Sequence, residues 1–452
     1  MKNPQSSMEG LPKPRRYFAI FAISCGTAVT VIDGHIPNVA LPTIAIELGI
    51  PASAAVLIVS VYQLVLVMSL LPFSALGNRI GLKRMYQLGQ LLFLVSAVLC
   101  YLAPTLELLL AARTAQSLGA AAALSVASAL VRATYPGKQL GRGLGVSSII
   151  VSSSAAIAPV LGGYIVAVAH WQWIFVATAP LCLLSLIVGQ HALPDNAPHK
   201  EPFSAVGAVL CAMTFGLLIS GLLGVSQGAS TDIVLVTIVV GLIISVAYIR
   251  RERSEALPIL PIDLLANRVV ALSIAGAQFA FIGSMTFILS LPFRLQTQYG
   301  FSPSEVGAVI VPWPLAMMVT APIAGILSDR YHPGVLGGIG MAIATTGMLL
   351  LYHMPIDAGH TAIMWRMAMC GTGFGIFLAP NVRVVLSAAP LHRAASAGGL
   401  VSTNRLVGQT LGAVLLAGLL SVGQGSNSTP ALIAAALTIL AMICSLARLR
   451  YR

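Results

Sequence analysis

The chain has 452 residues, of which 57% are hydrophobic and only 8% are charged. Soluble domains normally carry about 25% charged residues, and their single cores stop growing at roughly 250–300 residues. These values exclude a water-soluble globular protein. The net charge of +12 does not indicate nucleic-acid binding, because the basic residues form short clusters between apolar runs rather than one patch.

The apolar runs follow one another along the whole chain, and a membrane-crossing helix needs about 20 such residues. We therefore predict about fourteen membrane-spanning helices and an all-α polytopic membrane protein. The first run contains Asp33, leads into Pro37 and Pro42 and shows no cleavage site, so we interpret it as a span rather than a signal peptide. The runs lie near 17–40, 53–72, 86–104, 107–132, 143–168, 174–191, 204–224, 232–249, 269–291, 304–327, 334–352, 360–382, 394–421 and 429–447.

The loops between these runs alternate in charge. One set holds most of the basic residues, namely Lys13, Arg15, Arg16, Arg79, Lys83, Arg84, Lys138, Arg142, Lys200, Arg250, Arg251, Arg253, Arg330, Arg393, Arg448, Arg450 and Arg452. The opposite set holds Arg294 as its one basic residue, together with five acids. Basic loops stay in the cytoplasm, so we predict a multi-pass protein with both termini cytoplasmic.

The sequence also contains an internal repeat. The loop after the second run (74–84) resembles the loop after the tenth (325–330). Superposing Asn78 on Asp329 also places Arg142 on Arg393 and brings two intramembrane arginines, Arg113 and Arg366, into near register. Repeated halves are a plan of secondary transporters, whose substrate site lies near mid-membrane between them. We predict a cytoplasmic segment 1–16, a six-helix bundle 17–191, a linker 192–203, two inserted helices 204–249, a linker 250–268, a second six-helix bundle 269–447 and a cytoplasmic tail 448–452.

Several motifs resemble those of the major facilitator superfamily, specifically its fourteen-helix drug:proton antiporters. The matching residues are Asp33 with Asn38 to Pro42 in the first run, Arg79, Gly81 and Lys83 in the following loop, Arg113, Gln116 and Gly119 in the fourth run, and Pro159, Gly162 and Gly163 in the fifth. The chain departs from the family's usual residues at His35, Asn78, Ser117 and Ala158. Asn78 stands where the family usually has an aspartate that makes a charge contact between this loop and a helix, so the contact is in doubt in the N-terminal half. Asp329–Arg330 retains the contact in the C-terminal half. The resemblance implies a bacterial inner-membrane exporter that works by alternating access, driven by the proton gradient without a cofactor or metal.

Asp33 is the one acid that we place well inside the membrane. It lies 17 residues beyond Arg16, about 25 Å along a helix, whereas Arg113 enters from the opposite side about 9 Å past Glu107. The two depths nearly coincide, and buried charges in a bilayer usually pair or face water. We predict that Asp33 carries the proton and that Arg113 modulates it. A static ion pair that only orients helices is the alternative.

The remaining candidates fall into two groups. Possible substrate contacts are Tyr62, Gln63, Gln116, Trp313, Arg366 and Arg405, of which the two aromatic residues suit a lipophilic cation by cation–π attraction. Ordinary helix packing is the alternative for these aromatics, and carbonyl bonding for Arg366. Gating residues are Asn78, Arg79, Gly81, Lys83, Pro159, Gly162, Gly163, Asp329 and Arg330, where topology and helix packing are the alternatives.

The resulting prediction is a monomeric antiporter that exports amphiphilic, cationic drugs or biocides. Typical substrates of the resembled family are biocides, dyes and methyl viologen-like dications. A single buried acid argues for monovalent or zwitterionic cargo instead of dications. Two alternatives remain open, namely export of a specific metabolite or lipid, and a membrane-embedded transferase. A transferase needs paired acids or His/Asp at a membrane interface, and Asp357 with His360 has no supporting residues. The prediction is therefore that the chain is not an enzyme.

Overall fold

The computed structural model describes residues 11–136, 140–195, 204–252, 262–388 and 394–451. Within these ranges all regular secondary structure is helical. The elements before residue 195 are α1 (Lys13–His35), α2 (Pro37–Glu47), α3 (Ala52–Ala55), α4 (Leu57–Ile80), α5 (Leu82–Leu102), α6 (Leu106–Thr134), α7 (Leu140–Val168), α8 (Trp173–Val176) and α9 (Ala179–Ala192).

The described elements after residue 195 are also helices. Its elements are α10 (Ala205–Ser226), α11 (Thr231–Glu252), η3 (Ile262–Ala266), α12 (Arg268–Gln298), α13 (Pro303–Ile310), α14 (Pro312–Leu327), α15 (Pro333–Tyr352), α16 (His360–Ala388), α17 (Ala394–Ser421), α18 (Thr429–Ala447) and η5 (Arg448–Arg450). Every apolar run that the sequence analysis identified falls on one or two of these helices.

Twelve helices or joined helix pairs among the described residues are long and apolar enough to cross a membrane. The helices α7 and α17 are not among the twelve, so the sequence-based count of fourteen spans is not confirmed. Both are nevertheless long, at 29 and 28 residues. The chain is thus a helical, multi-pass membrane protein.

The helix of the first span continues beyond its apolar run and is broken about two-thirds of the way along. The run ends near residue 40, but α1 and α2 together continue to Glu47, with the break at Ile36. Pro37 lacks a backbone N–H, which permits this break without an unmet hydrogen bond. Asp33 therefore lies in the last turn of α1, just before the break.

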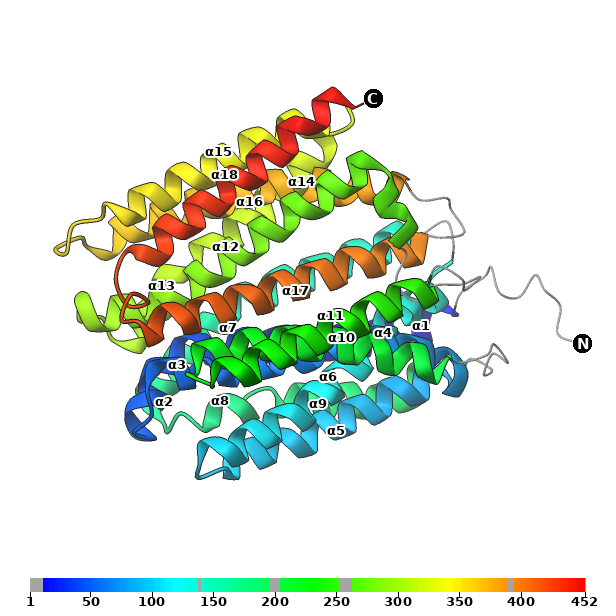
Figure 1. Cartoon of the computed structure of the whole chain (residues 1–452). Coiled ribbons are helices and arrows are strands. Elements are labelled where there is room, and N and C mark those ends of the chain that lie inside the picture. Colours follow the sequence, from blue (N-terminus) through cyan, green and yellow to red (C-terminus); the bar gives the residue numbers. More distant parts are fainter. Residues whose placement is uncertain (1–10, 137–139, 196–203, 253–261, 389–393, 452) are drawn as a thin grey trace, which may run out of the picture.

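The helices run roughly alongside one another, and both termini lie at the same end of the bundle, which we call the terminal end (Figure 1). The opposite end, where α2 meets α3 and α15 meets α16, is the far end. The helices α1 to α9 pack together, as do α12 to α18, and α10 packs against α4 and α17 and carries α11 as its partner. This arrangement accommodates the predicted inserted pair, while the exact domain boundaries stay a prediction.

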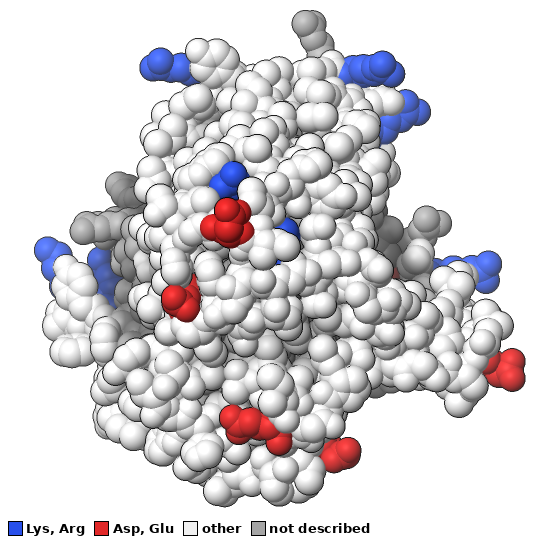
Figure 2. All heavy atoms as spheres, turned by 90° about the vertical axis from the view of Figure 1, so that its left-hand side faces the viewer, with Lys and Arg blue, Asp and Glu red and all other residues white. Residues whose placement is uncertain are grey.

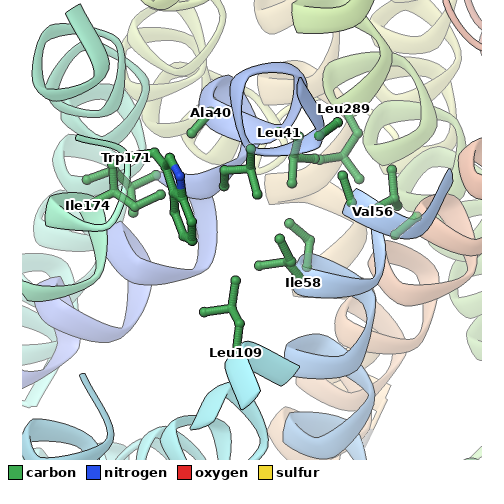
Figure 3. Packing of buried hydrophobic residues seen from close by; sticks show 14 of the residues in the cluster. Ala40, Leu41, Val56, Ile58, Leu109, Trp171, Ile174 and Leu289 are labelled. Carbon is green, nitrogen blue, oxygen red and sulfur yellow. The ribbon is translucent and has the colours of Figure 1, made fainter. Parts of the chain in front are cut away.

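The two halves share one hydrophobic core at the far end. That cluster joins residues of α1 to α8, such as Leu41, Ile58 and Trp171, to residues of α12 and α17, such as Leu289 (Figure 3). At the terminal end the cores of the two halves are separate: one cluster lies within residues 19–193 and another within residues 264–400. Figure 2 views the far end, which presents a continuous surface without a wide opening. The structure is therefore closed at the far end.

Glycines make this closure tight between α7 and α13. A Cβ atom on Gly163 would lie 2.4 Å from the carbonyl oxygen of Pro303, and one on Gly307 would lie 2.4 Å from that of Pro159. Real Cβ atoms do not approach so closely, so only glycine lets these two helices meet. The predicted gating residues Pro159 and Gly163 thus lie on the interface between the two halves.

Candidate functional site

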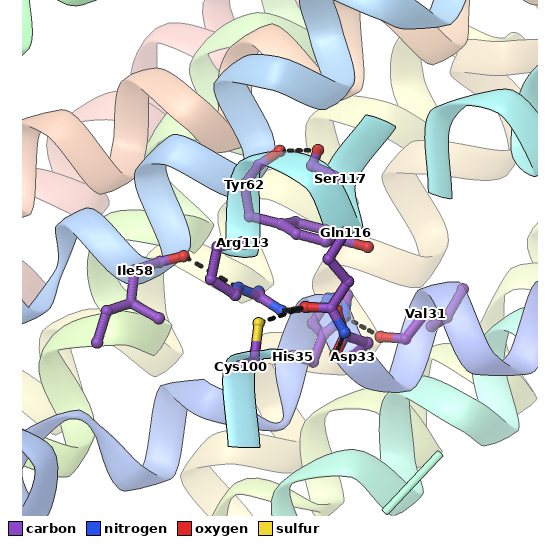
Figure 4. Close-up of polar contacts among 9 residues, drawn as sticks. All are labelled: Val31, Asp33, His35, Ile58, Tyr62, Cys100, Arg113, Gln116 and Ser117. Atoms are coloured by element: carbon purple, nitrogen blue, oxygen red, sulfur yellow. Dashed lines mark hydrogen bonds and ion pairs between the residues drawn. The ribbon is translucent and has the colours of Figure 1, made fainter. Parts of the chain in front are cut away.

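Asp33 and Arg113 meet inside the N-terminal half (Figure 4). The Asp33 Oδ2 atom, on α1, lies 2.7 Å from Nη1 of Arg113, on α6. The side chain of Asp33 is 0% exposed and that of Arg113 is 1% exposed. The depth argument from the sequence therefore paired the right two residues.

Gln116 closes the pair into a three-residue network. It lies one helical turn beyond Arg113 on α6, and its Oε1 accepts a hydrogen bond from Arg113 Nη1 at 2.8 Å. Its Nε2 donates to Asp33 Oδ1 at 3.1 Å. Both carboxylate oxygens of Asp33 are thus hydrogen-bonded, one by each residue of α6.

Further groups contact the Arg113 guanidinium, although its Nη2 atom has no hydrogen-bond partner among the described residues. Its Nε donates to the carbonyl of Ile58 at 3.4 Å. The guanidinium carbon lies 4.1 Å from the ring centroid of Tyr62 and 5.3 Å from that of Phe175. Aromatic faces attract cations, and the attraction is stronger when water is excluded. Tyr62 therefore serves Arg113 in this structure, so its ring face is not free for a cationic substrate.

The helices that carry this network are tied together directly. The hydroxyl of Ser117 donates to the backbone carbonyl of Tyr62 at 2.5 Å, which joins α6 to α4. Ser117 stands where glycine is usual in the resembled family, and its hydroxyl makes an interhelical hydrogen bond that glycine could not make. The site is a neutralised, hydrogen-bonded ion pair, and a carboxyl group of this kind has the chemistry to take up and release a proton.

The other predicted substrate contacts, Trp313, Arg366, Gln63 and Arg405, have different surroundings. Trp313 on α14 is 4% exposed and packs between Phe287 and Phe374, at ring-centroid distances of 6.0 and 4.9 Å. Arg366 on α16 donates to the carbonyl of Ala362 at 2.6 Å and lies over the exposed ring of Trp365.

Gln63 on α4 is buried, with its Oε1 unpartnered among the described residues. Arg405 on α17 is partly exposed and makes no hydrogen bond or ion pair with a described residue. None of these four residues makes a hydrogen bond or ion pair with Asp33 or Arg113 among the contacts of the described residues.

The predicted loop latches have partners that the sequence did not reveal. Lys83 at the start of α5 pairs with Asp195 at 3.0 Å, and Asp329 after α14 pairs with Arg383 of α16 at 2.6 Å. Asp329 thus bonds to Arg383 and not to its neighbour Arg330, which is exposed.

Two other members of the predicted N-terminal latch, Asn78 and Arg79, are exposed. Gly81 has a positive φ of 103° between α4 and α5, a conformation that favours glycine.

One buried arginine was assigned to the wrong environment. Arg448 was placed in a cytoplasmic tail, but it is 1% exposed and bonds within the C-terminal half. Its Nη1 donates to Ser273 at 3.0 Å and to Asn381 at 2.8 Å, and its Nη2 donates to Ser445 at 2.5 Å. The sequence feature that could have indicated burial was the position of Arg448 directly after an apolar helix, and this feature alone does not predict burial.

The match to known proteins agrees with this architecture. The model of the Major Facilitator Superfamily matches residues 23–413. The chain belongs to the Major Facilitator Superfamily. It is a transporter and not an enzyme, and the resemblance that its motifs predicted is confirmed.

Two relatives and one solved structure illustrate the likeness. The chain is 40% identical to the uncharacterized transporter YebQ of Escherichia coli, over 98% of this chain and 97% of that one. It is 27% identical to the methyl viologen resistance protein SmvA of Salmonella typhimurium, over 90% and 83% of the two chains. A crystal structure of a peptide transporter superposes with a TM-score of 0.73 at 18% identity, covering 98% and 97% of the chains, which supports the fold alone.

Proposed function

We propose that this Major Facilitator Superfamily protein is a proton-coupled antiporter that exports amphiphilic small molecules by alternating access. The observation that carries the proposal is the Asp33–Arg113–Gln116 network, a titratable carboxyl group held in the membrane core by a guanidinium and an amide. Intramembrane acids of this kind are expensive and are usually functional. Asp33 is the proton carrier in this proposal.

The closed far end is compatible with the proposed export. With both termini in the cytoplasm, as the basic loops predict, the far end faces outward and the structure represents a state closed to the outside. Loading would then take place from the cytoplasm, as export requires. We also propose that α7 and α17 cross the membrane, which gives fourteen spans in a bacterial inner membrane and a protein that works as a monomer.

The relatives support an exporter of foreign compounds. SmvA is named for methyl viologen resistance, and that name supports export of a toxic organic compound by this chain. The side chains add nothing in favour of a purely cationic cargo, because Asp33 is fully bonded and the faces of Tyr62 and Trp313 are covered. The cationic class of cargo therefore stays a prediction from the resemblance.

The test uses everted membrane vesicles from an efflux-deficient bacterium that expresses the full chain. Exported dyes should accumulate in energised vesicles, an uncoupler should abolish the accumulation, and Asp33→Asn should abolish it while the variant still reaches the membrane. Asp33→Glu is the matched control and should retain part of the activity. Uncoupler-sensitive uptake by Asp33→Asn at the wild-type level would exclude Asp33 as the proton carrier.

A further inference from the structure

In the described part of the chain, some charged side chains in the membrane core have a polar partner and one does not. Asp33 and Arg113 neutralise each other, and Arg366 bonds to a carbonyl of its own helix. Arg405 differs, because among the described residues it has no hydrogen bond and no ion pair. It lies 11 residues after the start of α17 and 16 before its end, or about 16 and 24 Å along the helix. An uncompensated arginine therefore lies near the middle of the bundle.

Arg405 faces the N-terminal half. Its neighbour Leu406 belongs to a hydrophobic cluster with Val29 of α1 and Tyr62 of α4. Arg405 is also close enough to His35, in the last turn of α1, to interact with it electrostatically. Both side chains are partly exposed, although they lie inside the bundle. They therefore border space between the two halves, where a transported molecule must pass.

His35 does not neutralise Arg405. Its Nδ1 atom lies 2.8 Å from the carbonyl oxygen of Val31, so Nδ1 carries the proton and donates. The ring then has Nε2 left for another contact, and the imidazole is either neutral or positively charged. Asp33, two residues before His35 on α1, is 0% exposed and has both oxygens hydrogen-bonded. Among the described residues, the region around Arg405 and His35 is thus positive or neutral and shows no carboxylate that contacts either side chain.

The missing counter-charge points to the ligand. An unpaired arginine at the centre of a membrane helix is costly, and such side chains mark substrate pathways. A guanidinium binds carboxylates through two parallel hydrogen bonds, which gives both strength and orientation. A purely cationic molecule would meet repulsion from Arg405 and would find neither a free acid nor an open aromatic face among the described core residues named above.

We propose that the exported amphiphile carries an anionic group of the carboxylate type, as an anion or a zwitterion, and that Arg405 binds this group between the two halves. The proposal rests on the proposed export function and names the chemical class of its cargo. His35 supplies a second polar contact through Nε2. The apolar body of the molecule lies against the hydrophobic residues that flank Arg405 on α17.

Binding to the purified full-length protein tests this without a proton gradient. The probes are matched acid and ester pairs, namely rhodamine 110 with its methyl ester rhodamine 123, and fluorescein with its methyl ester, followed by fluorescence anisotropy. We expect each acid to bind at least about tenfold more tightly than its ester, which is the strength of one charged hydrogen-bonded contact. Arg405→Gln should remove this preference, and Arg405→Lys should restore part of it.

Arg268→Gln is the matched control, because it removes the same charge from the exposed start of α12. It should leave the acid preference unchanged. Esters that bind as tightly as their acids, a preference that survives Arg405→Gln, or no binding of either acid would each overturn the proposal. None of these results depends on antiport, whereas uncoupler-insensitive transport would overturn the proposed function and leave the binding preference standing.

Discussion

Replacing Asp33 by asparagine tests whether the buried pair is a coupled electrostatic unit. The substitution keeps the shape of the side chain and one carbonyl oxygen, but removes the charge that compensates Arg113. The guanidinium is 1% exposed and its bond to Asp33 Oδ2 is 2.7 Å long, so water cannot replace the lost partner. Leaving one member of a buried ion pair alone costs about 3–5 kcal/mol. We expect a loss of this size in the free energy of unfolding.

The contacts that Arg113 keeps in the variant reduce that loss. Its bonds to the oxygen of Gln116 at 2.8 Å and to the carbonyl of Ile58 at 3.4 Å remain in the variant, as does the ring of Tyr62 at 4.1 Å. These contacts are neutral and replace part of the attraction. The loss in Asp33→Asn should therefore fall toward the lower limit of the range, about 3 kcal/mol.

A double-mutant cycle measures the pair itself. Asp33→Asn, Arg113→Gln and the double variant are unfolded reversibly by SDS in mixed micelles, with intrinsic fluorescence as the signal. Residues in one buried network show interaction energies of about 0.5–3 kcal/mol, so the double variant should be more stable than the sum of the single losses predicts. Additivity within about 0.3 kcal/mol would refute the reasoning, because it would mean that the two charges do not stabilise each other.

Three further variants probe neighbouring features. Gly163→Val places a Cβ 2.4 Å from the Pro303 carbonyl, so closure at the far end should be disfavoured. Overpacking costs about 1–3 kcal/mol, so dye transport should fall about tenfold. Gly325→Val meets open space and should transport normally, and equal activity of the two variants would contradict the role of the Gly163 contact. Asp329→Asn breaks an exposed ion pair, so its thermal stability should change by less than about 1 kcal/mol, and a larger loss would show that the pair is more than a surface contact. Gln116→Leu leaves an Asp33 oxygen without its donor and should destabilise the fold by about 1–3 kcal/mol in SDS unfolding, whereas an unchanged midpoint would remove Gln116 from the network.

Depth in the membrane could be predicted from the sequence, because each helical residue adds about 1.5 Å. That single number placed Asp33 and Arg113 at one level and led to their pairing. The positions of the helices were predictable for the same reason, since long apolar runs have few alternatives to a helix in a membrane. The glycines of the fifth run were also recognised as a helix-packing motif before their partner helix was known.

Rotation about each helix axis could not be predicted. Successive residues turn by about 100°, so an error of one residue changes which neighbour a side chain meets. The Asp329–Arg330 motif predicted a loop–helix charge contact without naming the helix residue, which is Arg383, 54 positions away on a helix whose rotation is set by packing. For Trp313 the sequence left substrate contact and helix packing open, and in the structure the ring packs between two phenylalanines. Arg448 was assigned by charge alone, without knowledge of the polar atoms that surround it.

The contacts of Arg113 also bear on how Asp33 would release and accept a proton. In the proposed cycle, protonation of Asp33 removes the counter-charge of Arg113, and a stranded guanidinium would make that step prohibitively unfavourable. The structure already supplies Arg113 with the Gln116 oxygen, the Ile58 carbonyl and the faces of Tyr62 and Phe175. These groups stabilise the cation whether or not Asp33 is charged, so they reduce the energy difference between the two protonation states. A carrier must visit both states in every cycle, and the second set of partners around Arg113 is what makes the buried pair suited to that use.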